Sequence, residues 1–572
     1  MCIFAFNKNI MIMFRNFILL LFPALFSAQC VIDADTYGID QSKHLIVINK
    51  NIDELNASFP GTKTYLNIEG DIYTFTAPVE NLQKGTAYTV SKSNTNYTAF
   101  FSDLPIIRMT TTGPIKDTPK VLGNFEILVP GETKISSMIG VEYRGASSQS
   151  YPKKSMEIEF WLDENGNETQ DISVLNLFED DAINLQAMYI EKLRINSVTA
   201  NDLWQEVHPD VYYKDKEPDA RSGILMKYSD LFVNGQYKGI YAVGEKEKRK
   251  FLKLKKFDNG IKGELYKGDQ WGGATLFNAL NPYNNNSDYW DGYEYKHPKE
   301  LIDWSNLYNF VDYVINSNTE TFNSSYSQKI DVDNMVDYFI FMNVTRALDN
   351  MGKNTYVAKY KKNEPYFIVP WDLDAVFGTY WEGSNQNIYN DLLFNGLFSR
   401  LWEDPDFRGK ISDRWAELRS SIITKEHING MLTDNYLKLK DNGIYTREKI
   451  AWSSYNFPTA QLNYHTTWVK NRIDYLDTVF PFLGVEDSKI PDSSISPFPN
   501  PAKGYFSVNL SSPLKNAEIK IIDFSGKELQ KTNIENLDKK TQIPVGGLDS
   551  GVYFIILKTK DAIRTSRLII KK

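Results

Sequence analysis

Hydrophobic and polar positions follow two different periods along the chain. Over residues 29–103, short apolar segments such as Tyr73–Phe75 are divided by Gly, Asn and Pro turns, which predicts the strands of a small β-domain. Over residues 104–483, strand-like segments give way to apolar residues at three-to-four spacing, as in Met335–Leu348, which predicts helices. A strand-rich part followed by a helix-rich part predicts an α+β, bilobal body.

The last part of the chain has the pattern of a separate all-β domain. Residues 484–500 are rich in Pro and Ser, which is typical of a linker. Beyond it, apolar segments such as Tyr505–Val508 and Val552–Leu557 are separated by Gly-containing turns. We therefore expect a small β-sandwich over residues 501–572 and another over residues 29–103, so that small β-sandwich domains flank the α+β body on both sides.

Residues 1–28 have the pattern of a secretory signal peptide. Basic residues precede the apolar run Phe17–Phe26, and the small pair Ser27–Ala28 follows it. The run is shorter than the roughly 20 apolar residues that a spanning helix needs, so we expect no integral membrane span in the mature chain. Cleavage after Ala28 would leave Cys30 as the one remaining cysteine, which excludes an intramolecular disulfide.

Composition narrows the functional classes. The 572 residues are 42% hydrophobic and 14% aromatic, which indicates a globular chain, and the length suggests three or four domains. A net charge of -8 disfavours a nucleic-acid partner, because phosphate binding needs a surplus of Lys and Arg. The five His residues show no metal-ligand spacing, which disfavours zinc chemistry.

A polar segment between a predicted helix and a predicted strand has the spacing of a phosphotransfer site. Asp349 and Asn354 are five positions apart. In a kinase catalytic loop this spacing separates the aspartate that receives the hydroxyl proton from the asparagine that holds magnesium. The pattern therefore makes Asp349 a candidate catalytic residue and Asn354 a candidate metal ligand. An ordinary turn would also account for these residue types.

The next segment strengthens the metal hypothesis. Two predicted strands flank Asn363 as a hairpin, with Asn354 nine residues before that centre and Asp372 nine residues after it. Symmetric positions of an antiparallel pair face each other, with Cα atoms about 4.5 to 5.5 Å apart. Mg²⁺ prefers such amide and carboxylate oxygens. We therefore expect Asn354 and Asp372 to share Mg²⁺, with Mn²⁺ as an alternative.

A second segment has phosphate-binding chemistry. Arg144 begins a loop of small and hydroxyl-bearing residues that includes Ser147 and Ser148 and that connects two predicted strands. Small residues let backbone N–H groups approach a phosphate, and serine hydroxyls add hydrogen bonds. We expect Arg144, Ser147 and Ser148 to contact ATP.

Two lysines after this loop have different predicted positions. Strand alternation places Lys154 on the apolar face, where an ammonium group needs an anion such as a nucleotide phosphate, and places Lys153 in a solvated ion pair. The carboxylate that orients Lys154 is open, with Glu206 as the candidate and a plain surface role as its alternative. Asn234–Gly235 predicts a hairpin turn between two later strands. Glu245, at the end of the second of these strands, either approaches the nucleotide or caps a helix.

Four segments of the central part resemble the spore coat protein H (CotH) kinase family. They are RGASSQSYPKKS from Arg144, LFVNGQYKGIYAVGE up to Glu245, PWDLD up to Asp374, and LFSRLWEDPDFRGKISDRWAELR. The resemblance runs over about residues 104–482 and implies an atypical bilobal protein-kinase-like domain that uses ATP and Mg²⁺. It also implies Asp372 as the principal metal ligand. Asp374 is either a second ligand or a carboxylate that caps the following turn.

The C-terminal domain resembles another known module. FPNPAKG near its start, IIDFSGKEL in its middle, LDSGVYFIIL near its end and a basic terminus are similar to the type IX secretion sorting domain. This resemblance implies that the chain passes through the periplasm of a Gram-negative bacterium and is secreted or displayed at the cell surface. The type IX secretion machinery is the implied partner.

Together these features favour a secreted atypical protein kinase that phosphorylates Ser or Thr of extracellular or surface proteins. The same groups could instead transfer AMP. A third interpretation is a surface-displayed protein that binds glycans or matrix and has no kinase turnover. The 34 Tyr and 11 Trp would suit stacking on sugars. A structural coat component is the fourth.

Overall fold

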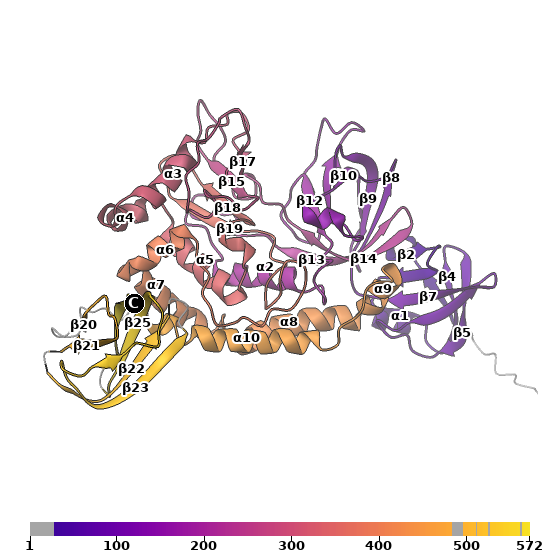
Figure 1. The fold of residues 1–572 in the computed structure, drawn as a ribbon. Helices are drawn as coiled ribbons and strands as arrows, with labels where there is room; N and C mark the ends of the chain where they lie inside the picture. The colour runs from indigo at the N-terminus through magenta and orange to yellow at the C-terminus, as the bar shows by residue number, and fades with distance from the viewer. Residues whose placement is uncertain (1–27, 483–495, 511, 524–526, 561–562) are drawn as a thin grey trace, which may run out of the picture.

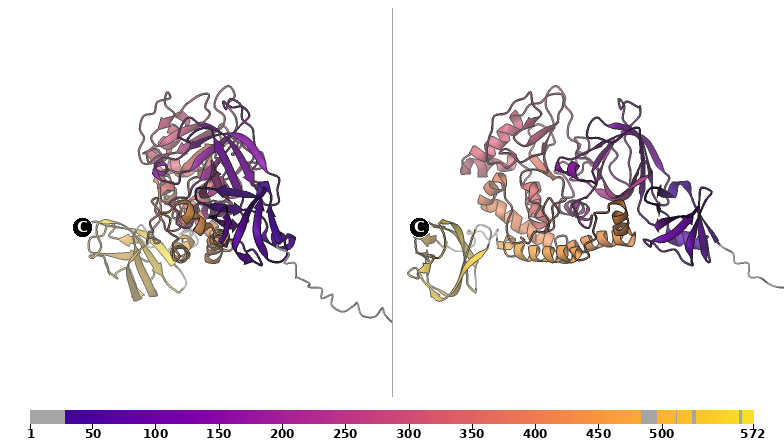
Figure 2. Two further views of the ribbon diagram at one scale, coloured as in Figure 1. Left: turned by 90° about the vertical axis from the view of Figure 1, so that its right-hand side faces the viewer. Right: turned by 45° about the vertical axis from the view of Figure 1, so that its right-hand side comes forward.

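The computed structural model describes residues 28–482, 496–510, 512–523, 527–560 and 563–572 (Figure 1). The predicted signal peptide lies outside the described residues except for Ala28, and so does the predicted linker up to residue 495. Among the described residues, no helix is both long and apolar enough to cross a bilayer. The N-terminal sheet and the C-terminal domain lie at opposite ends of the molecule (Figure 2).

The N-terminal part is one mixed sheet with the strand order β1-β4-β5-β6-β7-β3-β2. Its elements are β1 Ala28–Ile32, β2 Tyr37–Asp40, β3 Leu45–Ile48, α1 Ile52–Ser58, β4 Lys63–Ile68, β5 Asp71–Val79, β6 Tyr88–Lys92 and β7 Thr95–Phe101. The expected strands are present, but the expected sandwich is wrong here. Parallel pairing of β1 with β4 and of β3 with β7 joins all seven strands into a single sheet, and local alternation does not encode such pairing.

A closed barrel follows, with the strand order β10-β11-β12-β14-β13-β8-β9. Its strands are β8 Ile106–Thr111, β9 Val121–Leu128, β10 Ile135–Tyr143, β11 Met156–Trp161, β12 Ala182–Gln186, β13 Met226–Val233 and β14 Gln236–Gly244. Apolar side chains such as Ile139, Ile158 and Leu231 fill its interior. The predicted Asn234–Gly235 turn between β13 and β14 is confirmed, with both residues at positive φ.

Beyond the barrel lies a five-stranded sheet with the order β16-β17-β15-β18-β19, and helices lie beside and below it in the view of Figure 1. The strands are β15 Glu264–Gly268, β16 Tyr289–Trp290, β17 Tyr293–His297, β18 Thr355–Lys359 and β19 Tyr366–Pro370. The helices are α2 Asn196–Val207, α3 Ser305–Asn316, α4 Thr319–Ser325, α5 Val332–Thr345, α6 Gly396–Glu403, α7 Pro405–Arg419, α8 Lys425–Asp441, α9 Ile444–Ala451 and α10 Gln461–Leu476.

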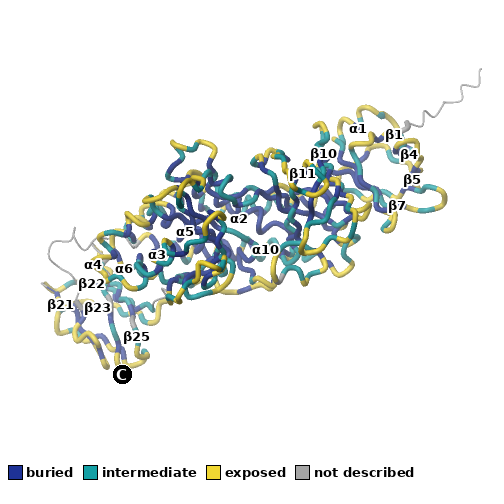
Figure 3. The backbone as a smooth tube through the Cα atoms, turned by 90° about the horizontal axis from the view of Figure 1, so that it is seen from above, coloured by how far each residue is buried: buried dark blue, intermediate teal, exposed yellow. Residues whose placement is uncertain are grey.

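Helix α5 is the centre of this part and corresponds to the predicted helix Met335–Leu348. Asp331 caps its N-terminus by accepting the backbone N–H of Asn334, and Arg346 ends it in the left-handed region. Every residue from Asn334 to Thr345 is buried, because α5 packs between β19, α2, α7 and α10. Seen from above, the buried residues concentrate along the middle of the molecule (Figure 3).

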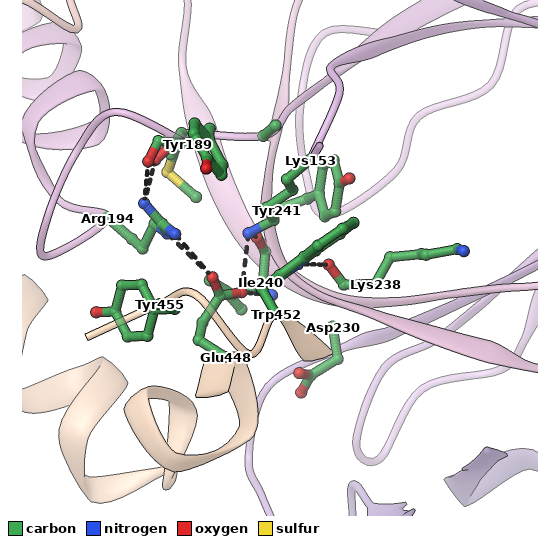
Figure 4. A network of polar contacts seen from close by, with 12 residues as sticks. Lys153, Tyr189, Arg194, Asp230, Lys238, Ile240, Tyr241, Glu448, Trp452 and Tyr455 are labelled. Carbon is green, nitrogen blue, oxygen red and sulfur yellow. Dashed lines mark hydrogen bonds and ion pairs between the residues drawn. The ribbon is translucent and has the colours of Figure 1, made fainter. Parts of the chain in front are cut away.

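A buried network of charges fastens α9 to the barrel (Figure 4). The Glu448 carboxylate accepts hydrogen bonds from Lys153 Nζ at 2.8 Å and from Arg194 Nη2 at 3.0 Å. Lys153 is only 1% exposed, so the predicted solvated ion pair is wrong. The reason is local: β11 begins at Met156, so Lys153 precedes the strand and does not follow its alternation.

The C-terminal domain contains a three-stranded and a four-stranded sheet whose apolar faces meet. Its strands are β20 Ser496–Phe498, β21 Tyr505–Asn509, β22 Leu514–Ile522, β23 Glu528–Leu537, β24 Ile543–Pro544, β25 Gly551–Lys558 and β26 Ile563–Ile570. Phe506 and Val508 from one sheet pack with Ile519, Ile555 and Leu568 from the other. Two packed sheets are the arrangement expected of a β-sandwich.

Candidate active site

The β18–β19 hairpin brings two predicted metal ligands to one end. Thr355 pairs with Pro370, and the Trp371 N–H donates to the Asn354 carbonyl at 2.9 Å. Asn354 therefore faces Trp371 rather than Asp372, one position away from the predicted register. Asn354 and Asp372 both have left-handed φ, 53° and 54°. Asn and Asp enter this sparsely populated region more readily than other non-glycine residues, and residues held there cluster at active sites as well as in turns.

Asn350 holds both of these backbone segments in place. Its Nδ2 donates to the carbonyl of Asn354 at 2.6 Å and to that of Trp371 at 3.0 Å. The Asn350 carbonyl in turn accepts a hydrogen bond from the Tyr338 hydroxyl of α5 at 2.7 Å. The central helix thus fixes the conformation of the hairpin end. Asn350 was not a predicted site residue, although it lies inside the Asp349–Asn354 motif.

Asp349 lies close to this hairpin end. It begins the 3₁₀ turn η4 Asp349–Met351, which follows α5. Its Oδ2 pairs with Lys353 Nζ at 3.0 Å. The motif therefore supplies a half-buried carboxylate, an ammonium group that holds it, and the Asn354 amide within six consecutive residues.

Asp372 links the hairpin to the barrel. Gln186, the last residue of β12, donates to Asp372 Oδ1 at 3.3 Å, and Arg144 donates from Nη1 to Gln186 Oε1 at 3.1 Å. Burial raises the pKa of Asp372, and the positive charges of Arg144 and Lys267 oppose this shift. Lys267 Nζ also lies 4.0 Å from the centre of the Trp371 ring. Arg144 was a predicted site residue, whereas Gln186 and Lys267 were not.

Asp374 belongs to the same group of carboxylates. Burial raises its pKa well above the usual value, and the negative charges of Asp372, Glu191 and Asp349 raise it further. Within the described part of the chain its carboxylate makes no hydrogen bond, so the structure gives no support to a capping role. The described residues contain no group of three or more His, Cys, Asp or Glu at metal-binding geometry. Any shared ion would therefore depend on the Asn354 amide as well.

The loop after Arg144 forms a short 3₁₀ turn, η2 Ser147–Ser150. Lys154 closes it, because its Nζ donates to the carbonyls of Gln149 and Tyr151, the latter at 3.0 Å. Lys154 is half-buried and lies outside β11, so its predicted inward position on a strand is wrong for the same reason as that of Lys153.

The two predicted glutamates have other partners. Glu206 lies on the exposed side of α2 and pairs with His427 Nε2 at 2.5 Å, so it does not orient Lys154, and that prediction is wrong. Glu245 is buried and accepts the backbone N–H groups of Phe178 at 2.6 Å and Leu225 at 2.8 Å. It supports two loops instead of capping a helix.

Glu247 is a buried residue near the site that the sequence analysis missed. It is 3% exposed, and its Oε1 has no hydrogen-bond partner among the described residues. Burial raises its pKa to about 7, and the positive charges of Arg144 and Lys267 oppose this shift. The alternation after β14 could have indicated it: Glu245 and Glu247 are buried, whereas Lys246 between them is partly exposed and pairs with Glu157.

Comparison with protein families covers these elements. A family model described as CotH kinase protein matches residues 141–476, which is more than half of the chain and includes every candidate site residue. A second model, described as a secretion system C-terminal sorting domain, matches residues 496–571. No curated protein matches the chain at a significant level. The chain therefore belongs to the CotH kinase protein family and carries a C-terminal sorting domain of a secretion system.

Proposed function

We propose that this chain is an exported atypical protein kinase that transfers the γ-phosphoryl group of ATP to a Ser or Thr hydroxyl of an extracellular or surface protein. The main support is the gathering of Asp349, Asn354 and Asp372 around one end of the β18–β19 hairpin. The barrel and the helical part would be the two lobes of a kinase-like fold, because Arg144 of the barrel reaches Asp372 through Gln186.

The oxygen donors at the hairpin end suit a hard divalent cation. Asp372 and Asn354 would hold Mg²⁺, with Asp374 as a further ligand, and Mn²⁺ accepts the same donor types. Burial and the repulsion of neighbouring carboxylates raise the pKa of Asp374, and a cation would offset both, which supports this assignment. When bound, the ion would neutralise charge on the phosphates during transfer.

Basic groups of the barrel side would bind the phosphates. Arg144 uses one N–H group on Gln186 and makes no other hydrogen bond with the described residues, so its remaining N–H groups could donate to phosphate oxygens. The adjoining Ser147–Ser148 backbone is available for the same purpose. Gly145 permits this loop: its φ is +100°, and a Cβ there would lie 2.0 Å from Ser148 Oγ.

Asp349 would act on the attacking hydroxyl. Lys353 holds Oδ2 of its carboxylate, which leaves Oδ1 for the substrate. In the transfer step the substrate oxygen bonds to the γ-phosphorus while the bond from that phosphorus to the β,γ-bridging oxygen breaks. ADP leaves with the bridging oxygen, and the hydroxyl proton passes to Asp349 Oδ1. Positioning and charge neutralisation would supply most of the rate enhancement.

The sorting domain defines where the substrate would be found. It supports recognition by the type IX secretion machinery and release outside the outer membrane of a Gram-negative cell. Extracellular or surface proteins are therefore the substrate class that this protein would meet.

The test is incubation of residues 29–572 with γ-labelled ATP, Mg²⁺ and candidate surface proteins. We expect label transfer that Asp349→Asn and Asp372→Asn abolish, while the exposed Asp434→Asn leaves it unchanged. Mass spectrometry of the product separates phosphoryl transfer from AMP transfer. Equal Mg-ATP binding and equal transfer by wild type and Asp372→Asn would overturn the proposal, and so would an added AMP group.

A further inference from the structure

A groove without charged side chains lies on the helical part, between the loop 385–389 and α10. Its volume is about 520 Å³, and none of the eleven residues that line it is Asp, Glu, Lys, Arg or His. Cavities of this size hold small organic ligands in many proteins. Five of the lining residues are carboxamides and three are aromatic. The groove shares no residue with the candidate active site.

Three of the carboxamides have no hydrogen-bond partner within the part of the chain that the structure describes. The side chains of Asn387, Asn463 and Asn471 make no hydrogen bond with the described residues and lie on the lining of the groove. Asn463 and Asn471 are eight positions apart on α10, which separates them by about 12 Å along the helix. In contrast, Gln461 donates to Asn385 Oδ1 at 2.9 Å. The unpaired amides present both donors and acceptors to anything that enters.

Aromatic residues form two parts of the groove lining: Tyr464 and Trp468 form an aromatic wall, and Tyr389 is more exposed. Tyr464 and Trp468 are one turn apart on α10, and their polar atoms are already bonded. The Tyr464 hydroxyl donates to the Gly378 carbonyl at 2.6 Å, and Trp468 Nε1 donates to the Ile388 carbonyl at 3.0 Å. Tyr389 is 38% exposed, so part of this aromatic residue is open to solvent.

This wall is built against the chain that follows the Asp372–Asp374 motif. Gly378 has a φ of +85°, and a Cβ there would lie 2.7 Å from the Trp468 ring, so only glycine lets the ring pack this closely. Packing and hydrogen bonds therefore hold the Tyr464 and Trp468 side chains, so an occupant would meet a preformed surface.

The lining chemistry selects the class of ligand. A nucleotide or phosphopeptide needs cationic partners, and the groove has none. A neutral sugar offers hydroxyl groups at its edge, which amides can bind in both directions, and an apolar C–H face that stacks on an aromatic ring. We propose that this groove binds a neutral oligosaccharide of the extracellular surroundings. The site is separate from the proposed kinase function and does not depend on it.

The test is calorimetric titration of the full mature chain with cellohexaose, xylohexaose, maltohexaose and chitohexaose. We expect saturable binding of at least one of these probes, and its loss or weakening by roughly three- to tenfold in each of Asn463→Ala, Asn471→Ala and Tyr389→Ala. Asn390→Ala is the matched control, since Asn390 is an exposed amide next to the groove that does not line it.

The folding control uses the same variants. Because the Asn463 and Asn471 amides have no hydrogen bonds to lose, the urea midpoint of these variants should equal that of the wild type. Absence of binding by all four hexasaccharides would overturn the proposal. Binding that the three groove variants leave unchanged would also overturn it, as would saturable binding of an uncharged hexapeptide in place of the sugars.

Discussion

Replacement of Glu448 by Gln tests whether buried charge holds α9 against the barrel. Glu448 Oε1 accepts Lys153 Nζ and the Ile240 N–H, both at 2.8 Å. Its Oε2 accepts Nε and Nη2 of Arg194 at 3.1 and 3.0 Å. Gln preserves the shape of the side chain but removes its negative charge. Two cations, with side chains 0% and 2% exposed, would then remain buried without a counter-charge.

The expected loss of unfolding free energy depends on whether Lys153 and Arg194 can lose their charge. Removal of one partner from a buried ion pair costs about 3–5 kcal/mol of unfolding free energy. Burial already lowers the pKa of Lys153 to about 8, so its ammonium can escape by releasing a proton. Neutralising a lysine of ordinary pKa at pH 7 costs on the order of 5 kcal/mol, which sets the upper limit of its contribution. Arg194 has no such escape.

The stability loss in Glu448→Gln should depend on pH, because Lys153 can release its proton. Without Glu448, the pKa of Lys153 in the folded variant falls further, so the folded variant binds fewer protons than its unfolded chain. Stability rises with pH wherever the unfolded state binds more protons. Folded wild type releases the same proton only near pH 8, so the two proteins differ in their pH dependence only below that value. The stability gap between Glu448→Gln and wild type should therefore narrow as pH rises from 7 through about 8, and stay at its smaller value up to pH 9.5.

Urea denaturation followed by tryptophan fluorescence measures this gap. All eleven tryptophans lie between Trp161 and Trp468, so the signal reports on the barrel and the helical part. Glu206→Gln is the matched control, because its exposed pair with His427 is worth less than about 1 kcal/mol. The reasoning is refuted if Glu448→Gln shifts the midpoint no more than the control does, or if the gap is as wide at pH 9.5.

Three further outcomes follow from other buried groups. Burial raises the pKa of Glu247 to about 7, so the free energy of unfolding should fall as pH rises from about 4.5 to 7. In urea denaturation, Glu247→Gln should therefore be about 3 kcal/mol more stable than wild type at pH 8 and equally stable at pH 4. Asn350→Ala removes the hydrogen bonds to the Asn354 and Trp371 carbonyls, so its free energy of unfolding should fall by about 2 kcal/mol and amide exchange at the hairpin end should be faster. Unchanged exchange would show that Asn350 does not hold the hairpin end. Cys30 is fully buried with its pKa raised to about 12, so a thiol reagent at pH 8 should modify it only in urea, and rapid modification of the native chain would disprove its burial.

Local patterns predicted those parts of the fold that local interactions determine. Helix α5, the strands of the hairpin and the Asn234–Gly235 turn depend on side-chain period and turn chemistry, which the sequence displays directly. The register of β18 with β19 was off by one position, because the turn is centred one half-residue earlier than Asn363. Both ligands still reach the same end of the hairpin, since a shift of one position does not separate them.

Long-range pairing determined what the sequence did not predict. The partner of Lys153 is Glu448, 295 residues further along the chain, and no local period relates the two. The alternation that assigned Lys154 to the apolar face was extended to residues that precede β11. Glu247 was missed for a different reason: it lies between Lys246 and Lys248. A basic stretch is typical of a solvated surface, whereas Glu245 and Glu247 are both buried.

Contacts between segments far apart in the sequence also set the distance between the two sides of the candidate site. On the barrel side of the candidate site, Arg144 reaches Asp372 through Gln186 by bonds of 3.1 and 3.3 Å, of which the second is long, and it lies over the Trp371 ring at 5.8 Å from the ring centre. Such a link cannot by itself fix the distance between phosphate-binding and metal-binding groups to the precision that positioning catalysis requires. The strong buried bonds of Glu448 join the barrel to the segment that continues into α10. The placement of the candidate site therefore depends on a carboxylate that does not belong to it.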